Sequence, residues 1–587
     1  MTAESPAGEV APRPKSGHAA SVLVCGALFL GAGAAAAYIL LSRSPAAPGW
    51  LGGRSAPAPP PSLGGLAAPP EPGIRWRPWG PEAFREAAKA DRLILLDLTS
   101  SWSHWSRLME LTTYAEPAVA EWIAARVVPV RLDRDARPEL ARRYGSSIPT
   151  TALLLPTGEL VSGGAYVPPG AFVPWAQRVA DSFSVNREAI LSASRAAWTQ
   201  ARENRAARLG PARDSAWSAS SPDARRAVAE AAVDAGFAAL GLAERETRRF
   251  PAPLAHRFLL EALAARPGGG SGVAARARLR RLLSGLARLE DPVWGGLFRY
   301  SRCPEWDCPE HEKLLTVQAA AIEDLSAASA VEAGQPWAGV AARAADFVEG
   351  RLRRGAGRYA SAQAADLRTG SGWIDGARFY ALSGPERERL GAPALDPASY
   401  AGAHADLAVA YLRASLALRR PALRAAALEC LAMLEDATAA DGRVRHRLDG
   451  GKGGEAGLLE DQLAVARAAV AAFAATREPR YERLFRRSFG FVRSRLRDPG
   501  TGALRVRREG TAAPAPGWSE PVDPDQTALA ALVLAEAAAA FGRPQDEAAA
   551  REALAWTLAR LDSVDRLLAA RVALRELHGR PGPRSAP

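Results

Sequence analysis

Paired segments of helical length fill most of the chain after residue 185. Residues 186–570 are rich in Ala, Leu and Arg, and their apolar residues recur at a helical period without a convincing run of strands. Helix pairs that recur at roughly 40–60-residue spacing imply a solenoid or a closed α/α toroid. The stretch holds enough helices to close a ring, so we expect an all-α domain that is either a solenoid or a closed α/α toroid. The clearest pairs are Ala224–Leu240 with Leu254–Ala265, Leu314–Ala330 with Ala338–Leu352, Ala403–Ala417 with Ala422–Asp436, Leu459–Thr476 with Tyr481–Arg495, and Ala528–Phe541 with Asp546–Leu561.

An uncharged apolar run lies near the N-terminus, from Ala19 to Leu41. It has about the length of one membrane span, ~20 residues, whereas the apolar core of a signal peptide is usually ~7–15 residues. We therefore expect a short polar tail at 1–18, an uncleaved transmembrane helix at 19–41 and a Pro/Gly/Ala-rich linker at 42–74, with a cleaved signal as the alternative. The short tail favours a single-pass membrane protein with its bulk outside the cytoplasm.

Residues 75–185 show the element order of a thioredoxin-like α/β domain. Short apolar runs at 92–98, 127–133 and 148–156 predict strands, a helix is expected over about 103–125, and another closes the domain at 171–183. Pro149 stands where that fold carries a cis-proline loop opposite its active-site helix. The fold class is therefore multidomain, with a transmembrane helix, this α/β domain, the toroid at 186–570 and a flexible tail at 571–587.

The start of the predicted active-site helix reads Ser103-His104-Trp105-Ser106, followed by Met109-Glu110. Together with the segment Leu132–Pro138, it resembles the thioredoxin-like domain of the spermatogenesis-associated thioredoxin-like family. In that family the helix opens with Cys-His-Trp-Cys. Dithiol exchange requires an attacking thiolate and a second thiol that resolves the mixed disulfide, so the two serines exclude this chemistry at the motif. Two interpretations of the domain remain. It is either a structural domain in which Ser103 is a helix N-cap, or a domain whose groove binds a peptide or partner.

The resemblance continues into the helical region, through Gly295–Ser301, Pro309–Gln318, Tyr359–Asp366 and Leu459–Gln462. It implies a toroid of the (α/α)6 type, similar to those of N-acylglucosamine epimerases and six-hairpin glycosidases, which place carboxylates or histidines at the cavity mouth. Acid–base chemistry on a sugar needs two such groups across a cavity. Each candidate also has a structural reading, because acidic residues are favourable at helix starts. The candidates are Glu310, His311, Glu312, Asp366 and Asp375.

Four cysteines in 587 residues exclude a disulfide-rich scaffold. Cys303 and Cys308 lie close enough for a local disulfide, with two free thiols as the alternative. A zinc site there would need a further ligand that the neighbouring sequence does not supply, so we expect no metal and no cofactor.

The net charge of +12 is carried almost wholly by arginine, since all but four of the 75 basic residues are Arg. The arginines interleave with apolar residues at helical spacing, which is typical of solvated helix faces. No P-loop, dinucleotide fingerprint or zinc finger is present, and we expect no nucleic-acid partner.

These features together predict a non-catalytic binding or scaffold protein of the cell envelope. It would be held to the membrane by the N-terminal helix and would take an unidentified protein or carbohydrate ligand. One alternative is a sugar epimerase or glycoside hydrolase acting in the toroid, and another is a redox role for Cys303 and Cys308. Facing acid or imidazole groups across a deep cavity would favour the enzyme, whereas an interior filled by arginine would argue against it.

Overall fold

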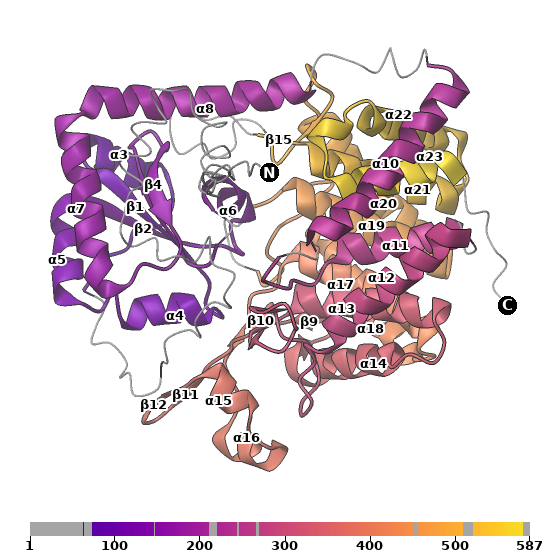
Figure 1. Cartoon of the computed structure of the whole chain (residues 1–587), viewed down its shortest axis with the longest axis horizontal. Helices are drawn as coiled ribbons and strands as arrows, with labels where there is room; N and C mark the ends of the chain where they lie inside the picture. The colour runs from indigo at the N-terminus through magenta and orange to yellow at the C-terminus, as the bar shows by residue number, and fades with distance from the viewer. Residues whose placement is uncertain are drawn as a thin grey trace, which may run out of the picture.

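The structure is a computed structural model that describes residues 63, 73–145, 147–209, 220–243, 246–265, 269–450, 455–508 and 521–578. Figure 1 shows a small α/β domain joined to a larger array of helices by the long helix α8 (Arg187–Leu209), which runs from one to the other.

The α/β domain is built on a four-stranded sheet in the order β2-β1-β3-β4. Strand β1 pairs parallel with β2 and antiparallel with β3, and β4 pairs antiparallel with β3. The strands are β1 Leu93–Thr99, β2 Val127–Asp133, β3 Thr150–Leu154 and β4 Leu160–Gly164. The helices are α3 Pro81–Ala90, α4 His104–Leu111, α5 Pro117–Arg126, α6 Pro138–Tyr144 and α7 Pro169–Val185. The single helix expected over 103–125 is thus two helices.

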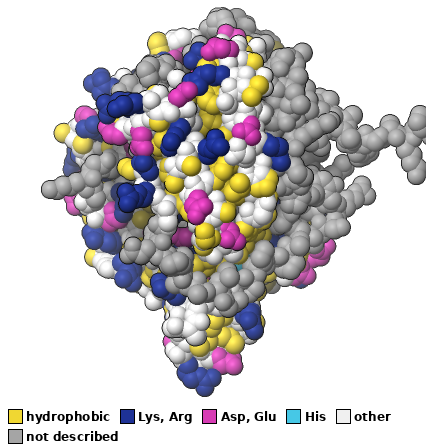
Figure 2. Space-filling model, turned by 90° about the vertical axis from the view of Figure 1, so that its left-hand side faces the viewer, with side chains coloured by type: hydrophobic (Ala, Val, Ile, Leu, Met, Phe, Trp, Pro, Cys, Tyr) yellow, Lys and Arg dark blue, Asp and Glu magenta, His cyan; other side chains and the backbone are white. Residues whose placement is uncertain are grey.

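Both faces of this sheet are buried, which explains why β1 is apolar along almost its whole length. Successive side chains of a strand point to opposite faces. Leu93 and Leu95 accordingly pack with residues of α5 and α7, whereas Ile94 and Leu96 pack with residues of α3 and α6. On the face shown in Figure 2, Lys and Arg side chains are interspersed with Asp and Glu, so the charge there is mixed in sign.

Six helices of the described chain form a closed inner ring, because each contacts the next and the last contacts the first. These helices are buried around most of their circumference, in keeping with Ala-rich sequences that lack a polar face. In ring order they are α11 Pro253–Ala265, α13 Leu315–Val331, α17 Ala401–Ala417, α19 Leu459–Thr476, α21 Pro524–Phe541 and α23 Arg566–His578.

An outer helix packs against each inner helix, which gives six helix pairs in the described residues: five hairpins of consecutive helices, and α10 with α23. Several outer helices begin with proline, whose fixed φ and missing N–H suit the first turn of a helix. In the same order they are α12 Gly269–Ala287, α14 Trp337–Phe347, α18 Pro421–Ala437, α20 Pro479–Phe491, α22 Pro544–Leu558 and α10 Pro222–Ala243. Four of the predicted pairs occur as expected. The first predicted pair is wrong, because α10 packs against α23 at the far end of the array and α11 packs against α12.

An arginine–carboxylate network joins four inner helices of this ring. Glu323 of α13 is buried and bonds Arg257 from α11, Arg413 from α17 and Arg467 from α19. Glu261, also of α11, pairs with two arginines of α23. Because α13 and α19 are not neighbours in the ring, the pair of Glu323 with Arg467 lies within it.

Short β segments cluster at one end of the ring, which we call the loop end. Two small helices, α15 Gly376–Tyr380 and α16 Gly384–Leu390, belong to the same connections. The segments are β5 Tyr300–Ser301, β6 Pro309–Glu310, β7 Lys313–Leu314, β8 Arg353–Gly355, β9 Arg358–Tyr359, β10 Ala362–Gln363, β11 Leu367–Thr369, β12 Gly372–Ile374, β13 Leu395–Asp396, β14 Leu504–Arg505 and β15 Val522–Asp523.

The predicted transmembrane helix and membrane location are not supported. Among the helices of the described residues, none combines the length and the apolar character that a membrane crossing requires. The apolar run at 19–41, on which the prediction rested, lies outside the described residues. The fold class is corrected accordingly to a mostly helical multidomain protein with an α/β domain.

Candidate functional site

The Ser-His-Trp-Ser motif (residues 103–106) begins helix α4 and faces the loop end of the helical ring. Ser103 caps the helix, because its hydroxyl accepts a hydrogen bond from the Ser106 backbone N–H at 3.3 Å. Ser103, His104 and Ser106 are all buried, and Trp105 is half-buried. The surface that a thioredoxin fold would offer to a partner is thus covered by this chain's own helical domain.

His104 makes the central contact of the junction. Its Nδ1 lies 3.0 Å from both carboxylate oxygens of Asp366, and its backbone N–H donates to Glu312 Oε1 at 3.2 Å. Burial by itself would lower the pKa of His104, but the Asp366 carboxylate outweighs this and raises the pKa to about 9. The Asp366 carboxylate therefore fixes the orientation of the imidazole at the junction.

Asp366 and Asp375 lie beside His104 and come from neighbouring segments of the loop end. Asp366 stands between β10 and β11 and accepts a hydrogen bond from the Gly376 backbone N–H at 2.9 Å. Asp375 follows β12 and accepts a hydrogen bond from the Leu63 backbone N–H. One ligating atom from each of His104, Asp366 and Asp375 lies within 4.8 Å of the others.

Glu310 and Glu312 complete the acidic side of the junction. Glu310 pairs with Arg302 at 3.2 Å, and Glu312, which is fully buried, has Arg299 at 3.9 Å. Burial and the neighbouring Glu312 charge raise the pKa of Glu310 to about 7. A carboxyl group with such a pKa can give or accept a proton near neutral pH.

His311, the remaining candidate from the sequence, stacks on Tyr380 with 5.5 Å between the ring centroids. Burial, followed by nearby cationic side chains, lowers its pKa to about 3, so the ring is neutral. The structure therefore brings four of the five toroid candidates together with the motif, and places His311 in an aromatic cluster.

Trp102 and Ile148, beside the motif, pack against the helical domain. They form one apolar cluster with Ala362 of β10, and Arg299 lies over the Trp102 ring at 4.8 Å. The Ile148–Pro149 peptide bond is cis, and Pro149 follows the residue that enters this cluster. Ser101 adds a hydrogen bond of 2.8 Å to Asp396.

A second histidine, His446, bridges the two domains. His446 Nδ1 lies 2.8 Å from Asp461, and its Nε2 lies 2.7 Å from the Asp135 carbonyl oxygen. Nearby, Arg142 of α6 pairs with Glu460. No sequence motif marks this contact, because it exists only once the two domains are docked.

We predict that His446 makes domain docking dependent on pH. Burial would lower its pKa, but Asp461 outweighs this and raises the pKa to about 9. The pairing of protonated His446 with Asp461 stabilises the folded state fully at pH values below the pKa of the unfolded histidine, about 6.5. This contribution to the free energy of unfolding is lost as the pH rises through about 9. The free energy of unfolding should therefore fall more steeply between pH 6.5 and 9 in the wild type than in His446→Gln. Parallel profiles from urea denaturation would contradict this.

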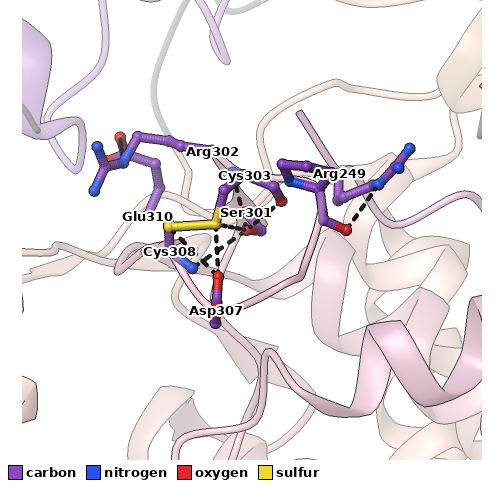
Figure 3. Close-up of a disulfide and its surroundings, with 8 residues drawn as sticks. Arg249, Ser301, Arg302, Cys303, Asp307, Cys308 and Glu310 are labelled. Atoms are coloured by element: carbon purple, nitrogen blue, oxygen red, sulfur yellow. Dashed lines mark hydrogen bonds and ion pairs between the residues drawn. A yellow bond between two sulfur atoms is a disulfide. The ribbon is translucent and has the colours of Figure 1, made fainter. Parts of the chain in front are cut away.

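Cys303 and Cys308 form a disulfide next to the junction (Figure 3). The bond closes the turn between β5 and β6, and β6 carries Glu310. Asp307 contacts both sulfur atoms, and the Ser301 hydroxyl accepts from the Cys303 backbone N–H at 3.2 Å. The disulfide thus links β5 to β6 and constrains the segment that carries Glu310.

A surface cavity of about 700 Å³ lies elsewhere, beside α18 and α20. None of the site residues predicted from the sequence lines it. Its lining is Glu435, Pro479, Glu482, Arg483, Arg486, Arg487 and Arg543.

Comparison with known proteins supports the resemblance drawn from the sequence. Residues 66–204 match the family Thioredox_DsbH, described as a protein of unknown function, DUF255. Spermatogenesis-associated protein 20 is 26% identical over 310 residues in mouse and over 313 residues in human. Each match covers 50% of this chain and 39% of the relative, so the chain spans about two fifths of the length of these curated relatives.

Solved structures similar to the chain include sugar-processing enzymes. A D-mannose isomerase has a TM-score of 0.40 at 11% identity, over 53% of this chain and 75% of that one. The cellobiose 2-epimerase of Bacillus thermoamylovorans has a TM-score of 0.37 at 9% identity, over 52% and 75%. Residues 66–204 are therefore similar to the Thioredox_DsbH family, and about half of this chain is similar to spermatogenesis-associated protein 20.

Proposed function

We propose that this protein is a non-redox binding and scaffold protein in which the thioredoxin-like domain caps the loop end of the helical ring. The observation that carries the proposal is the burial of the motif: Ser103 is 1% exposed and Ser106 is 7% exposed. A thioredoxin-type exchange would require an exposed thiolate at this place. The motif contains no thiol and its serines are buried. It instead supplies polar contacts between the two domains.

Contacts on several sides of the motif support a fixed cap. They come from separate parts of the α/β domain and reach separate hairpins of the ring, so tilting the domain would break several of them together. The pairs are Ser101 with Asp396, Arg107 with Trp373, Arg142 with Glu460, Glu139 with Arg507, and His446 with the Asp135 carbonyl.

Restoring the two thiols tests this proposal. A Ser103→Cys, Ser106→Cys variant should reduce insulin no faster than the parent protein, because a folded substrate cannot reach the motif. Both proteins carry the Cys303–Cys308 disulfide, so the rate of insulin reduction by the parent protein is the background. Insulin reduction well above that rate would show an accessible groove and would overturn the cap.

A second candidate function is a sugar-active enzyme, and the pairing of Glu310 with Glu312 is the observation that favours it. Acid–base chemistry on a sugar requires two acidic groups, and burial and the neighbouring Glu312 charge raise the pKa of Glu310 to about 7. Against it stands the arginine network inside the ring.

A thermal-shift screen with monosaccharides and glucuronides separates the two functions. An enzyme of this type should be stabilised by one sugar class, and Glu310→Gln should abolish turnover of that sugar while the protein still folds. No stabilisation by any sugar would leave the cap as the function.

A further inference from the structure

Three ligating side chains from three separate segments converge beside the motif. His104 begins α4, Asp366 lies between β10 and β11, and Asp375 follows β12. Their donor atoms lie within 4.8 Å of one another. One imidazole and two carboxylates form a donor set used for Zn²⁺ and for Mn²⁺ or Fe²⁺. We propose that His104, Asp366 and Asp375 bind one divalent transition-metal ion at the junction between the domains.

Unsatisfied polar atoms gather at the same place. Glu312 is fully buried, and its carboxylate lies against the motif because Oε1 accepts from the His104 N–H. Among the described residues, Glu312 Oε2 and His104 Nε2 have no hydrogen-bond partner. A buried polar atom without a partner costs about 1–3 kcal/mol, and native structures seldom leave such atoms unpaired. Water ligands of an ion held at His104 would supply donors to the Glu312 carboxylate, which contacts the His104 backbone.

Two other buried histidines provide the contrast. His446 uses both ring nitrogens, one toward Asp461 and one toward the Asp135 carbonyl oxygen. His404 likewise contacts the Tyr400 carbonyl oxygen and the Tyr359 backbone N–H. His446 and His404 are therefore bonded through both ring nitrogens, whereas His104 Nε2 has no hydrogen-bond partner among the described residues.

The separations and the orientation of the carboxylates also fit a metal ion. Two ligands held at ~2.0–2.2 Å from one ion and at right angles to each other lie ~2.8–3.1 Å apart, and His104 Nδ1 is 3.0 Å from each oxygen of Asp366. Backbone N–H groups of Gly376 and Leu63 hold the two aspartates in place. Such outer bonds orient the ligands of protein metal sites.

The experiment measures metal binding directly on the full-length chain without an affinity tag. After treatment with EDTA and gel filtration, isothermal titration with Zn²⁺ and with Mn²⁺ should show about one equivalent bound. His104→Gln and Asp366→Asn should each weaken binding at least ~10-fold. The matched control is His446→Gln, which removes a buried histidine–aspartate pair from the same junction and should bind like the wild type.

A second readout guards against loss through misfolding. Co²⁺ added to the wild type should give visible d–d absorption that is absent in Asp366→Asn, while both proteins show the same far-ultraviolet circular dichroism. The proposal is overturned if the wild type binds neither ion, if the His104 and Asp366 variants bind as well as the wild type, or if the His446 control loses binding equally. The cap would stand in each of these cases, because it rests on the burial of the motif.

Discussion

Asp291→Asn should destabilise the protein by ~3–5 kcal/mol, since it leaves two buried cations without their shared counter-ion. Asp291 accepts hydrogen bonds from Lys313 Nζ at 2.7 Å and from Arg387 at 2.8 and 3.0 Å, and all three side chains are fully buried. Burial opposes the charge of Asp291, but Lys313 and Arg387 outweigh it and lower the pKa of this carboxyl. Lys313 directly follows Glu312, so the loss should also displace the acidic side of the junction.

Urea denaturation at pH 7 measures this effect, and the neighbouring residue supplies the control. Glu290 pairs with Arg343, whose side chain is 56% exposed. Because exposed ion pairs contribute about 0–1 kcal/mol, Glu290→Gln should change the free energy of unfolding by less than ~1 kcal/mol. Equal effects of the two substitutions would refute the role given to Asp291.

The second large effect is expected inside the ring. Glu323→Gln removes the carboxylate that bonds Arg257, Arg413 and Arg467, and should cost ~3–5 kcal/mol. Burial alone would raise the pKa of Glu323, but the arginines, Arg467 first, outweigh it and lower the pKa well below its usual range. The charge is therefore present throughout the range in which the protein is handled.

Glu536→Gln is the matched control for Glu323. Glu536 lies 3.9 Å from Arg413 and its side chain is 22% exposed, so water can replace the lost contact. This variant should stay within ~1 kcal/mol of the wild type. If Glu323→Gln unfolds at the same urea concentration as Glu536→Gln, the network does not hold the ring together.

The elements of the fold were predictable because their signals are local. The apolar run at 92–98 becomes β1, Leu93–Thr99, and the periodic segments from Leu314 onward become four of the hairpins. A ring was expected from the number of helices, but the helices that close it were not predictable in this way. Closure depends on α11 packing against α23, and α10 then covers α23 from outside. No local pattern encodes contacts between helices at opposite ends of the array.

The candidate site shows the same division. The sequence predicted that Glu310, Glu312, Asp366 and Asp375 share the mouth of a toroid, and separately that Ser103 and His104 form a motif without thiols. That His104 bonds Asp366 follows from the docking of two domains, which residue spacing cannot reveal. His446 was passed over for the same reason, because its partner Asp135 lies in the other domain. The ion pairs within the ring likewise join residues far apart in the chain.

The rate at which a thiol placed at position 103 reacts tests the central claim most directly. In a Cys25→Ser, Cys430→Ser background, Ser103→Cys is compared with Ser101→Cys, since position 101 is exposed and position 103 is buried. A thiol at an exposed helix start is activated by its lowered pKa. If the motif is capped, the Ser103→Cys thiol should react with Ellman's reagent at least ~100-fold more slowly than the Ser101→Cys thiol, because a buried thiol reacts only when the structure around it opens. In urea, where the protein is unfolded, the two thiols should react equally fast. Equal rates in the folded protein would show that the motif is open and would contradict the account.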